Sequence, residues 1–154
     1  MSSMVLVIFA LSITLFQISC KKEVTAQTTT TALTKEQLLV QKTWEMDMVY
    51  LVIGCNFSSY VKGGANTTGA NYDNIRLTFN SNGNGIHIDQ FGHSLPFTWH
   101  FTSSDKRSLS LTVDNVTYLW DMVEIADNYL HSSVQVTLGG NSNNIETCRM
   151  KQIP

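Results

Sequence analysis

Charged residues are scarce in this chain. Lys, Arg, Asp and Glu make up 14% of its 154 residues, well below the roughly 25% of an average globular protein. The formal net charge is −2, so the basic excess that marks nucleic-acid-binding proteins is missing. Only 2 prolines and 9 glycines are present, which excludes a collagen-like or low-complexity chain. Ser, Thr and Asn must supply the polar surface, and low charge with many Thr, Val, Tyr and Phe predicts a β protein.

The chain also lacks an apolar run long enough for a transmembrane helix. The longest, residues 5–16 (VLVIFALSITLF), is shorter than the roughly 20 residues that cross a bilayer. Its length and position are those of the apolar region of a secretory leader. The small residue Ser19 then stands directly before Cys20, and two lysines follow.

This junction resembles the lipobox of bacterial lipoproteins. The resemblance implies that residues 1–19 are a signal peptide, that Cys20 is acylated, and that the protein is anchored by its lipid to the outer membrane of the bacterial cell envelope, facing the periplasm or the cell surface. Two alternatives remain open: cleavage after Ala26 to give a soluble secreted protein, or retention of the leader as an anchor. Residues 20–33 then form the lipidated cysteine and a polar tether, and residues 34–154 form the domain.

One short helix is expected at the start of this domain. Thr34 and Gln37 have the spacing of a capping box, which predicts a helix over residues 35–42. After it, apolar residues alternate with polar ones, as in antiparallel strands that have one buried face. This period-two pattern occurs in the segments YDNIRLTF, GIHID, PFTWHFT, SLSLTV, VTYLWDM and SVQVTL.

Turn residues separate these segments at hairpin spacing, for example in NSNGNG, SSDKR and GGNSNN. With a strand from Thr43 and another at the end of the chain, the count is about eight. An antiparallel meander of this size usually closes into an up-and-down β-barrel, because closure leaves no exposed edges. The predicted fold class is therefore all-β: an up-and-down barrel of about eight strands behind one short helix.

Several of these motifs resemble the lipocalin-like lipoproteins of Gram-negative bacteria over residues 34–154. Trp44 follows the predicted helix, Phe79 and Gly83 match a Phe-x-x-x-Gly hairpin, and a Trp-turn-Leu-x-Leu hairpin is matched by Trp99, Leu109 and Leu111. The resemblance implies a barrel that binds a small apolar or amphipathic molecule in its open end.

The aromatic residues are the candidate ligand-binding residues. Six of them share the inward parity of their strands: Phe79, Phe97, Trp99, Phe101, Tyr118 and Trp120. Such side chains fill the interior of a small barrel or line a cavity in it. If a pocket exists, we expect Trp99, Tyr118 and Trp120 to form its wall, because they combine an apolar body with a polar group.

A second candidate site lies in residues 54–74, a Gly- and Asn-rich segment that is long for a connection. We expect it to be a loop on which Phe57 and Tyr60 make adaptable contacts, the alternative being plain disorder. This segment supports another function: a protein-docking or inhibitor module with a solid core.

Cysteines and histidines complete the candidates. Cys55 and Cys148 are predicted to lie on neighbouring strands of the closed meander, which favours a disulfide over two buried thiols. His87, Asp89 and His100 stand opposite apolar residues on their strands, so we expect them on the solvated face rather than in a metal site. No catalytic motif and no cofactor-binding motif is present in the sequence, so we expect no enzymatic activity, no cofactor and no metal.

Overall fold

The computed structural model describes residues 32–138 and 141–154. Residues Ala32–Pro154 form a compact unit with its own core. The predicted leader, Cys20 and most of the tether lie outside the described residues. Within that described part, no helix is both long and apolar enough to cross a membrane.

The helix α1 (Lys35–Leu39) begins at the predicted capping box. The Thr34 hydroxyl accepts a hydrogen bond from the Gln37 backbone N–H, and the Gln37 side chain accepts one from the backbone N–H of Thr34. The helix is shorter than predicted, because the chain turns after Val40 into the first strand. There the Trp44 indole N–H donates a hydrogen bond to the Leu39 carbonyl at 2.8 Å, which fixes the helix against the barrel.

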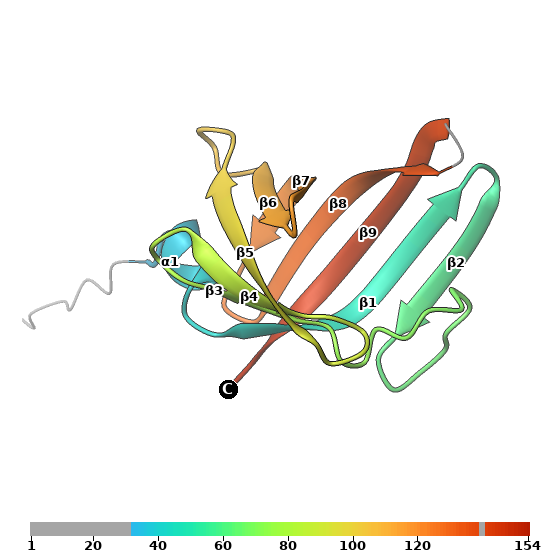
Figure 1. Ribbon diagram of the computed structural model, residues 1–154, viewed down its shortest axis with the longest axis horizontal. Helices are drawn as coiled ribbons and strands as arrows, with labels where there is room; N and C mark the ends of the chain where they lie inside the picture. Colours follow the sequence, from blue (N-terminus) through green and yellow to red (C-terminus); the bar gives the residue numbers. More distant parts are fainter. Residues whose placement is uncertain (1–31, 139–140) are drawn as a thin grey trace, which may run out of the picture. The chain divides into compact units, whose positions relative to one another are not determined.

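All the strands are antiparallel to their neighbours, as predicted. The strands are β1 (Thr43–Ile53), β2 (Asn56–Val61), β3 (Arg76–Phe79), β4 (Asn84–Ile88), β5 (Ser94–Phe101), β6 (Leu109–Val113), β7 (Val116–Ile125), β8 (Tyr129–Leu138) and β9 (Asn141–Ile153). Strands β3 to β9 pair in chain order, and β1 pairs with both β3 and β9. This closes an eight-stranded barrel and confirms the predicted fold class (Figure 1).

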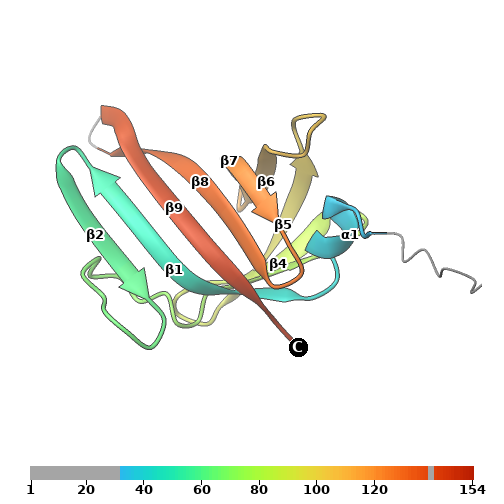
Figure 2. The same ribbon diagram turned by 180° about the vertical axis from the view of Figure 1, so that it is seen from behind.

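Strand β2 is additional to the barrel. The first residues of β1, Thr43 to Glu45, pair with β3, whereas Met48 to Ile53 pair with β2 on the same edge. The other edge of β1 pairs with β9 along nearly its whole length, with an irregularity between Met46 and Met48. The prediction of a single long loop over residues 54–74 is therefore wrong at its start, since Asn56–Val61 is a strand. Figure 2 shows β2, β1, β9 and β8 side by side.

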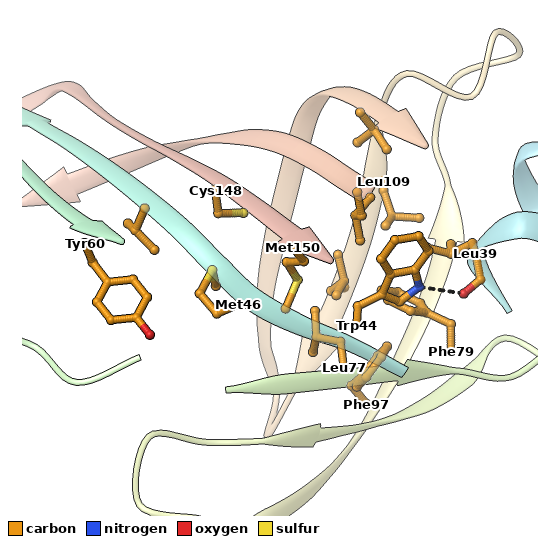
Figure 3. Close-up of a cluster of buried hydrophobic side chains, with 14 residues drawn as sticks. Leu39, Trp44, Met46, Tyr60, Leu77, Phe79, Phe97, Leu109, Cys148 and Met150 are labelled. Carbon is orange, nitrogen blue, oxygen red and sulfur yellow. Dashed lines mark hydrogen bonds between the residues drawn. The ribbon is translucent and has the colours of Figure 1, made fainter. Parts of the chain in front are cut away.

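The core fills the end of the barrel near α1. Trp44, Phe79, Leu109 and Met150 are fully buried there. The Phe97 ring packs edge-on against Phe79, and other apolar side chains extend the cluster along β1 and β9 (Figure 3). We call this the closed end, because α1 covers it; the opposite end, where the β1–β2 and β8–β9 turns lie, is the open end.

Candidate ligand site at the open end

Rows of paired residues run across the inner face of β8, β9 and β1. Nearest the closed end, Leu130, Met150 and Met46 form one row and are buried. The next row is buried too, and consists of Ser132, Cys148, Val49 and Tyr60. The third row is only partly buried. This open-end row consists of Trp120, Val134, Glu146, Leu51 and Ser58.

The open-end row meets the core at Trp120. Trp120 pairs with Leu109, which is fully buried, and its side chain packs against the core cluster. Val134, Glu146 and Leu51 then carry the row across β8, β9 and β1. Barrel strands are tilted, so a row of paired residues rises along the barrel as it crosses them. The row thus offers an apolar surface that leads from the open end down to Trp120.

Glu146 is the exceptional member of this row. Its paired neighbours on both sides, Val134 and Leu51, are apolar. Burial raises the pKa of its carboxyl above the ordinary value, because the charged form loses solvation there. Within the described residues no ion pair is formed by this carboxylate. By parity, it is also the one Asp, Glu, Lys or Arg on the inward side of the described strands. Among the described residues it therefore has no cationic partner, and its paired neighbours on both sides are apolar.

The rim around this row is apolar and exposed. Val116 and Tyr118 on β7 share the parity of Trp120, and they are 52% and 45% exposed. Ile53 on β1 shares the parity of Leu51 and is also exposed. Exposed apolar side chains that face inward are unusual for a closed core. They extend the apolar surface of the open-end row outward.

Tyr72 lies over the second row. Its ring packs against that of Tyr60 with centroids 5.1 Å apart. The Tyr60 hydroxyl donates a hydrogen bond of 2.6 Å to Asp73. Burial, and then the charge of Glu146, raise the pKa of Tyr72. The segment after β2 therefore packs Tyr72 against the core at Tyr60, the member of the second row that lies on β2.

The predicted aromatic residues divide between core and open end. Phe79 and Phe97 are buried in the core, and Phe101 packs against it. The Trp99 indole N–H lies between the carbonyl oxygens of Asn80 and Asn84, at 3.2 and 3.0 Å. This contact ties it to the β3–β4 turn at the closed end. Tyr118 is exposed at the rim of the open end, and Trp120 is half-buried where the open-end row meets the core.

Phe57 and Tyr60 do not act as a pair on a loop. Both lie on β2 and face opposite sides of it, as the alternation of a strand requires. Tyr60 is buried, with its hydroxyl bonded to Asp73, so the prediction that it makes adaptable loop contacts is wrong. Phe57 is 63% exposed, and its ring stacks on that of Tyr50 at 5.5 Å.

An exposed apolar patch surrounds Phe57 on the outer face. Val52 pairs with Phe57 on one side and with Ile145 on the other, so these residues form a row across β2, β1 and β9. The outer patch consists of Tyr50, Val52, Phe57 and Ile145, all of them exposed. Beside it, Tyr50 also lines an open hollow of about 230 Å³ with Met48, His131, Thr147 and Arg149.

The free edge of β2 adjoins this patch. The backbone of Ser59 bonds away from β1, to Thr67, and the Val61 N–H bonds away from β1, to Ala65. Because backbone groups alternate along a strand, those of Phe57 point the same way. No described residue bonds to them on that side. The edge of β2 is therefore covered at Ser59 and Val61 and open at Phe57.

The predicted Cys55–Cys148 disulfide is not formed, and both thiols are free. Cys55 lies exposed in the β1–β2 turn, whereas Cys148 is buried and pairs with Val49 in mid-strand. From Val49 the strand runs on to Ile53, a distance of roughly 13 Å, before the turn begins. A disulfide needs Cα atoms within about 7 Å of each other. The prediction was wrong because it identified neighbouring strands but not the register between them.

His87 is also misplaced by the sequence prediction. It pairs with Leu77, a buried residue, so it faces inward, whereas Ile86 faces outward and is 38% exposed. Burial lowers the pKa of His87. The pattern was misleading because both isoleucines of β4, Ile86 and Ile88, lie on its outer face, whereas the inner face carries Gly85 and His87. Among the residues described, no three His, Cys, Asp or Glu side chains are grouped as a metal site would require.

Sequence reasoning did not select Glu146, although its parity was readable. In the last strand it alternates with Cys148 and Met150, which are both buried. An acidic residue at an inward position was the available signal. Comparison of the chain with family models, curated proteins and solved structures finds no match.

Proposed function

We propose that this protein is a non-enzymatic barrel that binds a small apolar or amphipathic molecule at its open end, held at the bacterial outer membrane by acylated Cys20. The observation that supports ligand binding is the open-end row. It is partly exposed, it rests on two fully buried rows, and it continues into an exposed apolar rim. Ligand sites combine such an apolar lining with a few polar groups that fix orientation.

The packed closed end limits how deep the ligand reaches. Trp44, Phe79 and Leu109 occupy the interior there, so the ligand would lie across the inner face of β7, β8, β9 and β1 rather than inside a deep cavity. A shallow site of this kind suits a molecule with one apolar body and one polar end.

The test uses two neighbouring residues on opposite faces of β1. An apolar fluorophore such as 1-anilinonaphthalene-8-sulfonate is titrated into the purified chain, into Leu51→Asn and into Val52→Asn. We expect Leu51→Asn to weaken binding about tenfold and Val52→Asn to leave it within about twofold. Loss of binding in Val52→Asn alone would contradict the proposal, because that result assigns the fluorophore to the outer patch.

A second candidate function is protein docking through the outer patch. Its support is the stacked, exposed pair Phe57 and Tyr50, beside the part of the β2 edge at Phe57 to which no described residue bonds. A suitable occupant is an extended segment of another protein, which would add a strand to the edge at Phe57 and cover the patch. Phe57→Lys would abolish such an interaction and leave the open-end row untouched.

A further inference from the structure

We infer that the ligand at the open end carries a cationic amine, and that Glu146 recognises it. This inference rests on the proposed function, since it specifies the chemistry of the molecule that binds there. Its basis is the position of Glu146 between Val134 and Leu51 on the inner face of the barrel, in the same row as Trp120.

An unpaired carboxylate between apolar neighbours lowers the stability of a protein. Partial burial removes solvation from its charged form, and no cation of the described residues compensates for that loss. The other partly buried carboxylates of the barrel wall do have partners. Glu45 is bound by Lys62 and Arg76, and Asp47 by Arg149. Glu146 differs from them in having no cationic partner among the described residues. An ammonium group of the ligand would supply both the positive charge and the hydrogen-bond donors.

The surroundings of Glu146 determine the rest of the ligand. Val134 and then Trp120 follow it along the row, at strand spacings that place Trp120 roughly 10 Å away. An apolar body extending from the amine would lie over Val134 and reach the indole. On the other side, Leu51 and the exposed Ile53 would cover the amine end. A primary amine on an alkyl chain meets both requirements, whereas a fatty acid would set one carboxylate against another.

The experiment compares three ligands that differ only in the polar end: decylamine, decan-1-ol and decanoate. Each is titrated calorimetrically at pH 7 into the purified chain, Glu146→Gln and Glu124→Gln. Glu124 is an exposed, outward-facing residue of β7, so Glu124→Gln changes the net charge equally without touching the site. We expect the wild-type chain and Glu124→Gln to bind decylamine at least about tenfold more tightly than decanoate, as a charge-assisted hydrogen bond allows. In Glu146→Gln the preference for decylamine over decanoate should fall below about threefold.

The outcomes separate this inference from the proposed function. Equal binding of all three ligands, or a preference for decanoate, would overturn the inference and leave ligand binding intact. If none of the three binds, the proposed function fails as well. Misfolding does not obscure the result, because glutamine preserves the size of the side chain and removes the buried charge. Urea denaturation should show Glu146→Gln to be at least as stable as the wild-type chain at pH 7.

Discussion

The Phe97 ring lies directly against the backbone of Gly85 on the paired strand. The two residues face each other across β4 and β5, and a Cβ added to Gly85 would overlap the ring and approach the Thr78 carbonyl oxygen to 2.6 Å. Phe97 in turn packs edge-on against Phe79 at the centre of the core. Absence of a side chain at Gly85 is thus what allows the aromatic core of the closed end to form.

Gly85→Ala should therefore destabilise the barrel by about 2–3 kcal/mol, in the range typical of an overpacked core. Urea denaturation followed by tryptophan fluorescence measures the change. Gly64→Ala is the matched control, since its Cβ would meet neighbours at ordinary contact distances of 3.5 Å. Equal stability of the two variants would show that Phe97 can move away at little cost.

The two free thiols should differ sharply in reactivity. Cys55 is exposed in a turn, whereas Cys148 is buried, and burial raises the pKa of its thiol to about 11. Since the thiolate is the reactive form, iodoacetamide at pH 8 should modify Cys55 within minutes and leave Cys148 unmodified. Peptide mass spectrometry of a Cys20→Ser chain gives the site of labelling.

Denaturation is the control for this experiment, because unfolding should make both thiols react. A chain whose mass is lower by two hydrogens, and in which neither thiol reacts after denaturation without reductant, would instead indicate a Cys55–Cys148 disulfide.

Glu45 should make stability depend on acidic pH. Its side chain is nearly buried, and Lys62 and Arg76 lie 2.7 and 2.9 Å from the same carboxylate oxygen. Burial by itself raises the pKa of Glu45, but the hydrogen bond with Lys62 and the charges of Lys62, Arg76 and Lys151 outweigh it, so the pKa lies below the ordinary value of 4.5. The folded state thus favours the charged form. The stabilisation is present above pH 4.5 and is lost as the pH falls through the lowered pKa.

Glu45→Gln should cost about 1–2 kcal/mol at pH 7, because the cations that it leaves behind are only partly exposed. The difference from the wild-type chain should shrink when unfolding by urea is measured at pH 3. Glu124→Gln should show no such loss, since Glu124 is exposed. A constant difference between Glu45→Gln and the wild-type chain from pH 7 to pH 3 would exclude this linkage.

Cys20→Ser should release the protein from membranes. Acyl chains on one cysteine stabilise membrane attachment by about 0.8 kcal/mol for each buried CH₂, and serine offers no thiol for their attachment. Fractionation of cells that express both forms measures the change, with Cys55→Ser as the control for loss of a thiol. Retention of the Cys20→Ser chain in the membrane fraction would instead indicate an uncleaved leader, and secretion of both forms would indicate cleavage near Ala26.

The local sequence pattern was sufficient to predict the fold class and most of the helices and strands. The capping box at Thr34 was confirmed by its hydrogen bonds, and alternation placed Phe79 and Phe97 in the core. The candidate site was harder to predict. Tyr118, Trp120 and Trp99 all have the inward parity that was predicted for them. Parity does not tell which end of a barrel a residue occupies, and the hydrogen bonds of Trp99 hold it at the closed end.

The amino-acid sequence by itself determined that this chain forms antiparallel hairpins with one apolar face, because a period of two is a property of each strand alone. Only the tertiary structure decided that β1 pairs with three neighbours, that Cys55 and Cys148 stay apart, and that Glu146 lies between Val134 and Leu51 with no cation of the described residues bound to it. These relations depend on strand register and on the depth of each row in the barrel. Register and depth are set when segments far apart in the sequence pack together, so the pattern within one strand cannot predict them.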